Sequence, residues 1–228
     1  MTSRIFSMQT KSVKVLFLGL PIGVPRYISF QEKIRESRRE NILFLEHPPT
    51  ITAGINYNID NLLVAPKFLS FHGISLNYIK RGGDFTAHEP GQIVAYFHID
   101  LKSRQLGIAD FLQAILESCK SATLEVWGIS LVSKPDSPGL YLESDPRLKI
   151  LSIGVYFKSW FTSYGVAFNV SNNFSAFSCI HPCGGNWQNM TSIQNIGLDC
   201  VEDKKKLWKT KVSEKFLQFL ERNPAKNQ

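Results

Sequence analysis

Apolar residues occur along this chain in short blocks, separated by polar, glycine-containing or proline-containing segments. Most of the blocks are rich in β-branched and aromatic residues, which is typical of β-strands. One block, residues 93–101, is continuous enough to predict a strand in the centre of a sheet. The predicted strands cover residues 13–20, 41–46, 74–80, 93–101, 139–143, 149–158 and 165–170.

Three longer segments have helical spacing instead. The clearest is 108–127, whose apolar residues follow one stripe of a helix, and residues 27–39 and 204–220 predict two more helices. Because the strands come in clusters and the helices lie between or after them, we expect an α+β fold with a mixed β-sheet and flanking helices. The stripe consists of Ile108, Phe111, Leu112, Ile115, Leu116 and Cys119.

The composition is that of a folded protein. The chain has 228 residues, of which 43% are hydrophobic and 20% charged, so it can build a core and is not a disordered chain. The sequence contains no internal repeat and no long linker. We therefore expect residues 1–228 to form a single domain.

The formal net charge of +7 is unevenly distributed. Residues 1–40 contain eight basic and three acidic side chains, residues 201–228 contain eight and four, and residues 41–200 contain ten and twelve. Because the body of the chain is mildly acidic, we expect no nucleic-acid partner. The basic ends are typical of solvated helix faces, with a docking surface for an acidic partner as the alternative.

The cysteine content indicates a reducing compartment. Four cysteines are too few and too scattered for a disulfide framework in a chain of this length. No apolar run approaches the ~18–20 residues that span a bilayer. Residues 15–24 follow basic residues as a signal peptide would, but they lack a small-residue cleavage pattern, which favours a buried strand. We therefore expect a cytoplasmic protein with no membrane association.

A glycine-rich turn follows the strand predicted at 74–80. Gly82 and Gly83, between Arg81 and Asp84, would let a ligand approach the backbone closely and meet its amide groups. A hairpin that binds nothing is the alternative. The segment lacks both phosphate-loop glycine spacings, so it gives no support to ATP or NAD binding, and we expect no cofactor.

Lys149 is a candidate base at the start of an otherwise apolar strand. An exposed strand end is the ordinary explanation of a lysine in this position. Inside a cleft, however, loss of water favours the neutral amine, which makes a lysine usable as a base.

Cys183 is a candidate nucleophile because it lies in a turn between Pro182 and two glycines. Backbone amides that are free in such a turn stabilise both a thiolate and an oxyanion. Cys119, on the helical stripe, and Cys179, after two phenylalanines, are expected to be packed. The spacing Cys179-x-His181-x-Cys183 is reminiscent of a metal site, but the proline within it and the lack of a second ligand cluster predict no metal.

Taken together, these segments resemble the octanoyltransferases of lipoate biosynthesis, also called lipoyl(octanoyl) transferases or lipoate-protein ligase B. The matching residues appear in the family's order and cover residues 15 to 200. They are Phe17-Leu18-Gly19-Leu20, His47-Pro48-Pro49-Thr50, Arg81-Gly82-Gly83 with His88 and Pro90-Gly91-Gln92, Pro138-Gly139-Leu140-Tyr141, Lys149 with Ser152-Ile153-Gly154, Gly165-Val166-Ala167-Phe168-Asn169-Val170, and Pro182-Cys183-Gly184.

The resemblance implies the fold shared by biotin and lipoate protein ligases, with an acyl pocket. It places Cys183 on the family's acyl-accepting cysteine and Lys149 on its catalytic lysine. It implies transfer of an octanoyl group from acyl carrier protein to lipoyl domains of 2-oxoacid dehydrogenase subunits or the glycine cleavage H protein, without ATP. The residues it assigns to the acyl site are Arg81, Gly82, Gly83, Asp84, Phe85, Thr86, Ala87, His88, Ser152, Ile153, Gly154, Gly165, Val166 and Ala167.

Three positions depart from the family's pattern. The family usually has tyrosine at Ala87, glycine at Glu89 and histidine at Tyr164. We therefore expect the pocket edge around His88 to differ in size and charge, and Tyr164 to supply a hydroxyl in place of an imidazole. These departures leave the acyl-chain preference open. Two alternatives also stay open: an ATP-dependent lipoate or biotin ligase, and a catalytically silent acyl-binding protein of the same fold.

Overall fold

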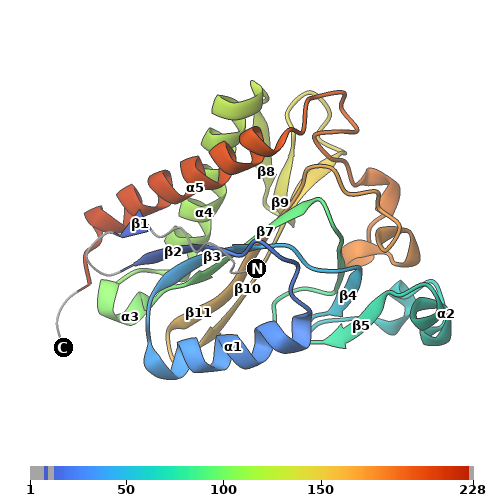
Figure 1. Ribbon diagram of the computed structural model, residues 1–228, viewed down its shortest axis with the longest axis horizontal. Helices are drawn as coiled ribbons and strands as arrows, with labels where there is room; N and C mark the ends of the chain where they lie inside the picture. Colours follow the sequence, from blue (N-terminus) through green and yellow to red (C-terminus); the bar gives the residue numbers. More distant parts are fainter. Residues whose placement is uncertain (1–7, 10–12, 226–228) are drawn as a thin grey trace.

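The computed structural model describes residues 8–9 and 13–225, and a large mixed sheet runs through this part of the chain (Figure 1). Its eight strands lie in the order β1 (Met8–Gln9), β2 (Lys14–Phe17), β3 (Asn41–Leu45), β7 (Gln92–His98), β11 (Phe161–Asn169), β10 (Lys149–Lys158), β9 (Ser137–Leu142) and β8 (Leu131–Lys134). Strands β2 and β3 pair in parallel, and the other ladders of this sheet are antiparallel.

Helices cover both faces of the large sheet (Figure 1). On one face lies α1 (Val24–Ser37), whose Tyr27 is buried against Leu43 and Tyr96. On the other face lie α4 (Ile108–Trp127) and α5 (Glu202–Arg222), whose apolar stripes pack on β7 and β11. The predicted helix at 108–127 is confirmed at both ends. A short helix, α3 (Leu101–Arg104), follows β7.

A second, three-stranded sheet stands at one end of the large one (Figure 1). It consists of β4 (Thr50–Ala53), β5 (Ser75–Tyr78) and β6 (Phe85–His88) in the order β5-β4-β6. The helix α2 (Pro66–Phe71) and the short turn η1 (Ile59–Asn61) connect β4 to β5. Three more single turns, η2 (Phe177–Cys179), η3 (Pro182–Gly184) and η4 (Trp187–Asn189), follow β11.

The strands predicted from the pattern all occur, and β7 is central as expected. Strands β1, β4, β6 and β8 were not predicted. Pro48 and Pro49 do end β3, but the chain resumes as β4 in the other sheet at Thr50. The excess of basic side chains near the carboxyl end belongs to α5, and several of its lysines lie within 4.0 Å of acidic neighbours. Among the described residues, no helix is long and apolar enough to cross a membrane.

Candidate active site

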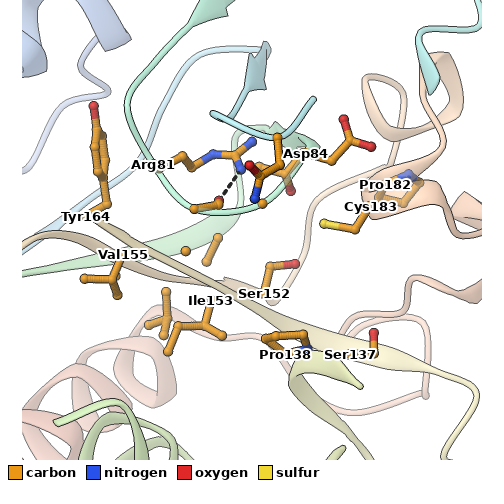
Figure 2. Close-up of a pocket in the computed structure, with 18 of the residues that line it drawn as sticks. Arg81, Asp84, Ser137, Pro138, Ser152, Ile153, Val155, Tyr164, Pro182 and Cys183 are labelled. Carbon is orange, nitrogen blue, oxygen red and sulfur yellow. Dashed lines mark hydrogen bonds between the residues drawn. The ribbon is translucent and has the colours of Figure 1, made fainter. Parts of the chain in front are cut away.

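A cavity of about 590 Å³ lies where the small sheet faces the β9–β10–β11 end of the large sheet (Figure 2). Its walls come from several parts of the chain that are far apart in sequence. Cys183 and Lys149 both line it. The other lining residues that the sequence predicted are Arg81, Gly82, Gly83, Asp84, Thr86, His88, Ser152, Ile153, Gly154, Gly165, Val166 and Ala167.

The glycine turn at 81–84 is fixed against both sheets. The amide of Asn56 donates to the Gly83 carbonyl at 3.2 Å, and the amide of Gly82 donates to the Val155 carbonyl of β10 at 3.2 Å. A Cβ atom at Gly54 would lie 2.2 Å from the Gly83 oxygen, so this close approach requires glycine at position 54. The turn is therefore a rigid part of the cavity wall rather than a free hairpin.

Arg81 is buried and secures this turn to β4. Its Nε donates to Thr52 Oγ1 at 3.1 Å, and a terminal nitrogen donates to the Thr52 carbonyl at 2.6 Å. Burial lowers the pKa of the Arg81 guanidinium, while the nearby Cys183 opposes this shift. Arg81 thus brings a fixed positive charge close to the thiol (Figure 2).

Cys183 presents its thiol from a strained turn. Its φ of 52° and ψ of 39° lie in the left-handed region, which a residue with a side chain rarely adopts. The sulfur is directed into the cavity (Figure 2) and lies 3.7 Å from the position that a Cβ atom of Gly83 would take. Strain of this kind recurs at functional sites because it fixes the direction of a side chain.

Two of the backbone amides next to Cys183 are not free, contrary to the expectation from the sequence. The amide of Gly184 donates to the His181 carbonyl at 3.1 Å, and the amide of Gly185 donates to the Pro182 carbonyl at 3.0 Å. Both bonds close the turn itself, so these two amides are already occupied. The geometry of the turn, rather than its free donors, is what distinguishes Cys183.

The other three cysteines have different surroundings. Cys119 is fully buried in the main core, which raises the pKa of its thiol. Burial also raises the pKa of Cys179, in the small core, and of Cys200, whose sulfur contacts the Val170 carbonyl. Cys183 is the exposed cysteine among the described residues. The expectation that Cys119 and Cys179 are packed is confirmed.

Lys149 reaches the cavity from the first position of β10. Its side chain lies over Gly139 of the paired strand β9, and its Nζ lies 5.4 Å from the centre of the Tyr141 ring. Lys134 shares this ring, with its Nζ at 4.4 Å. The register pairs Lys149 with Tyr141, so the β9–β10 ladder fixes the backbone position from which the Lys149 side chain extends.

Two neutral imidazoles lie next to β6: His88 lines the cavity, and His47 lies outside the lining with its ring centre 5.1 Å from that of His88. His47 donates from Nδ1 to the Ile22 carbonyl and accepts from the Tyr96 hydroxyl at 2.7 Å, while burial lowers the pKa of His47 to about 4. His88 donates from Nδ1 to Gln92 Oε1 at 2.8 Å, and burial lowers the pKa of His88 to about 3. Because both imidazoles are neutral near pH 7, this part of the wall suits an uncharged ligand.

Tyr164 lines the cavity and is nearly fully buried. Its φ of 64° turns the ring toward α1, where it lies 5.7 Å from each of the rings of Tyr27 and Tyr96. Burial raises the pKa of Tyr164 to about 12, so its hydroxyl is neutral. The expected exchange of an imidazole for a hydroxyl therefore adds no charge to the wall.

Phe85 and Ala87 do not line the cavity. Successive residues of a strand point to opposite faces, so Thr86 and His88 face the cavity while Phe85 and Ala87 enter the small core. Glu89 also turns away. Its buried carboxylate accepts from the amides of Phe174 and Ala176 and from two side chains in the same loop. We expected Ala87 and Glu89 to change the size and charge of the pocket edge around His88. This expectation is wrong, because neither side chain faces the cavity.

Sequence reasoning missed part of the wall. Tyr96 lies in the central strand, where it was counted only as core, and Met190 follows the Cys183 turn and pairs with Lys149. The further residues missed are Asn56, Ile79, Leu112, Asp136, Ser137, Val155 and Phe157. A tyrosine between apolar neighbours in a buried strand was the one signal available for Tyr96.

The fold is that of the lipoate-protein ligase catalytic domain. A crystal structure of lipoate-protein ligase A bound with ATP superposes with a TM-score of 0.73 at 14% identity, covering 91% of this chain and 85% of that one. The bipartite lipoate protein ligase from Thermoplasma acidophilum gives a TM-score of 0.72 at 14% identity, covering 91% of this chain and 83% of that one.

The sequence matches identify the family within this fold. Residues 27–212 match the model of the lipoyl protein ligase A/B catalytic domain, and the chain belongs to this family. An octanoyltransferase of Leptospira interrogans is 56% identical over 82% of this chain and 87% of its own length. An octanoyltransferase of Desulforamulus reducens is 36% identical over 74% and 75%. The resemblance seen in the sequence is confirmed, and the chain is an acyltransferase.

Proposed function

We propose that this protein transfers an octanoyl group from acyl carrier protein to a lysine amine of a lipoyl domain, through a thioester on Cys183. The geometry at Cys183 carries the proposal: an exposed thiol in a left-handed turn, directed into a cavity that Lys149 also lines. The octanoyltransferase relatives support the acyl group and the reaction.

In the first half-reaction the Cys183 sulfur attacks the carbonyl carbon of the donor thioester. A new carbon–sulfur bond forms, the donor's carbon–sulfur bond breaks, and the proton of Cys183 passes by way of Lys149 to the leaving thiol. Exchange between two thioesters is nearly isoenergetic, so a thiol suits this donor and splits the transfer into two steps. The donor is already activated, and the reaction needs neither ATP nor a metal.

In the second half-reaction the acceptor amine attacks the acyl-Cys183 carbonyl. An amide forms, the Cys183 carbon–sulfur bond breaks, and the proton of the amine passes by way of Lys149 to the departing thiolate. An ammonium group cannot attack, so a base beside the thioester is required. The Lys149 amine, which lies across Gly139 at the cavity, fits this role.

The cavity suits an unbranched acyl chain. Small residues of β10 and β11, including Gly154, Gly165 and Ala167, leave room beside the sheet. The neutral rings of His88 and Tyr164 complete the wall without a charge. An acyl chain gains from such a surface because each buried methylene contributes about 0.8 kcal/mol.

The partners are those that the resemblance to the octanoyltransferases implies. We assign octanoyl-acyl carrier protein as donor, and the lipoyl domains of 2-oxoacid dehydrogenase subunits or the glycine cleavage H protein as acceptors, in the cytoplasm. The test is transfer from purified octanoyl-acyl carrier protein to a purified lipoyl domain, without ATP, followed by the intact mass of each protein. Appearance of the octanoyl mass on the acceptor supports the proposal. Transfer of free octanoate or lipoate with ATP, accompanied by pyrophosphate exchange, would indicate the ligase alternative.

A further inference from the structure

The strained turn at Cys183 requires stabilising contacts, and η1 provides some of them. The amide of His181 donates to the Asn61 carbonyl at 2.8 Å. The side-chain nitrogen of Asn61 lies 3.9 Å from the position that a Cβ atom of Gly184 would take. Asn61 therefore bonds to the turn before the nucleophile, and its side chain lies near the turn after the nucleophile.

The Asn61 side chain is itself fixed by the glycine turn. Its Nδ2 donates to Asp84 Oδ2, and the other oxygen, Asp84 Oδ1, accepts from the amide of Asn58 at 3.0 Å. Asp84 is 9% exposed, so these bonds form largely out of water, where an unpaired polar group is costly. The Asp84 carboxylate thus holds the η1 turn, even though the residue lines the cavity.

These contacts close a ring around the thiol. The Cys183 sulfur lies 3.7 Å from the position that a Cβ atom of Gly83 would take, the neighbouring Asp84 bonds to Asn61, and Asn61 bonds to the backbone two residues before Cys183. Neighbouring bonds attach the same two segments: Leu63 donates to the Cys179 carbonyl at 2.9 Å, and Leu62 pairs with Ile180. The Asn61 side chain is the link in this ring that can be removed without substituting the nucleophile or a residue that lines the cavity.

We propose that Asn61, paired with Asp84, is a positioning residue that keeps Cys183 in its left-handed conformation with the sulfur at the cavity. The inference rests on the proposed role of Cys183 as acyl acceptor. Asn61 does not line the cavity in which the acyl chain would bind. Its removal should therefore slow attack by the thiol and leave donor binding largely unchanged.

The first test compares Asn61→Ala with the wild-type enzyme in single-turnover acylation of Cys183 by octanoyl-acyl carrier protein. We expect the acylation rate constant to fall at least tenfold, with a KM for the donor within about twofold of wild type. Asn41→Ala is the matched control. Asn41 is a buried asparagine of β3 that accepts from His98 at 2.9 Å, so its loss also costs stability, but it does not contact the Cys183 turn.

The second test exchanges the two partners. Asn61→Asp alone sets two carboxylates against each other and should slow acylation at least as much as Asn61→Ala. The double variant Asn61→Asp/Asp84→Asn reverses donor and acceptor, so the hydrogen bond re-forms and at least half of the lost rate should return. A purely structural role predicts that rate follows Tm in every variant, Asn41→Ala included.

Two results would overturn the inference. One is a wild-type acylation rate in a folded Asn61→Ala enzyme, and the other is a double variant that acylates no faster than Asn61→Asp alone. Absence of any octanoyl adduct on the wild-type enzyme is a different outcome. It would remove the proposed function, and the inference would fall with it.

Discussion

The Lys149 side chain lies across the α-carbon of Gly139. A Cβ atom at position 139 would be 2.5 Å from Lys149 Cε and 3.2 Å from its Nζ, and Gly139 has a φ of 136°. The path of the proposed base to the cavity therefore exists because β9 has a hydrogen atom where other residues have a side chain. The sequence motif Pro138-Gly139-Leu140-Tyr141 thus has a physical explanation.

Gly139→Ala should displace the Lys149 amine and reduce octanoyl transfer by at least tenfold. The control is Gly73→Ala, because Gly73 also has a positive φ, of 68°, yet a Cβ atom there would meet nothing within 4 Å. Gly73→Ala should cost about 1 kcal/mol of stability through backbone strain, and Gly139→Ala should cost more, because its Cβ atom would also lie 2.4 Å from the Leu151 carbonyl oxygen. Steady-state kinetics and urea unfolding separate the effects. Equal activity in the two variants would contradict the geometry argued for Lys149.

Lys149→Arg should abolish transfer while leaving the fold intact. The substitution keeps the charge and the approximate length, but a guanidinium does not deprotonate and cannot serve as a base. Lys134→Arg is the matched control, since Lys134 lies over the same Tyr141 ring without lining the cavity. It should retain at least half of the wild-type rate. Near-wild-type turnover in Lys149→Arg would remove Lys149 from the mechanism.

Glu89→Ala should reduce the stability of the protein and leave its preference among acyl chains unchanged. The change leaves the amides of Phe174 and Ala176 without their acceptor in a buried site, at a cost of roughly 2–4 kcal/mol. The preference among hexanoyl, octanoyl and decanoyl donors should not move, because Glu89 faces away from the cavity. Glu143→Ala, at an exposed position, controls for loss of charge. A changed preference among the three acyl donors in Glu89→Ala would show that Glu89 does shape the pocket edge.

The buried histidines predict a loss of stability in acid. Burial lowers the pKa of His47 to about 4 and the pKa values of His88 and His98 to about 3, from 6.5 when unfolded. Below pH 6.5 the unfolded chain binds protons that the folded chain excludes, so each histidine removes about 1.4 kcal/mol per pH unit down to its folded pKa.

The measurement is urea unfolding between pH 5 and pH 8. The free energy of unfolding should be nearly flat above pH 7 and fall steeply below pH 6.5. His88→Asn should make the acid limb shallower, because one of the three groups is gone. A free energy that stays flat to pH 5 would mean that these imidazoles accept protons in the folded state.

Much of the fold was predictable because its elements carry their own pattern. The stripe from Ile108 to Cys119 is a helix with one buried face, and β10 is a continuous strand. Strand β4 was not predictable in the same way. Its four residues follow two prolines and are buried by the flanking strands β5 and β6, by Leu69 of α2 and by the loop around Phe177, which is tertiary information that a local pattern does not contain.

The residues of the site also differ in whether a local sequence pattern could predict them. Gly82, Gly83 and Cys183 were visible because glycine turns are unusual in sequence. Asn61 was not, since an asparagine in a polar turn has many ordinary explanations, and its meaning depends on Asp84 and His181 arriving beside it. The misassignment of Phe85 and Ala87 has a simpler cause. The resemblance marked a continuous segment, whereas a strand presents alternate residues to the cavity.

The central claim is that the octanoyl group rests on Cys183 between donor and acceptor. The direct measurement is peptide-level mass spectrometry of enzyme mixed with octanoyl-acyl carrier protein and quenched in acid, where thioesters survive. The account predicts one octanoyl adduct, on the peptide containing Cys183, that disappears when a lipoyl domain is added and never forms in Cys183→Ala. Cys179→Ser, which changes a packed thiol, should form the adduct normally. An adduct on another residue, or full transfer by Cys183→Ala, would contradict the account.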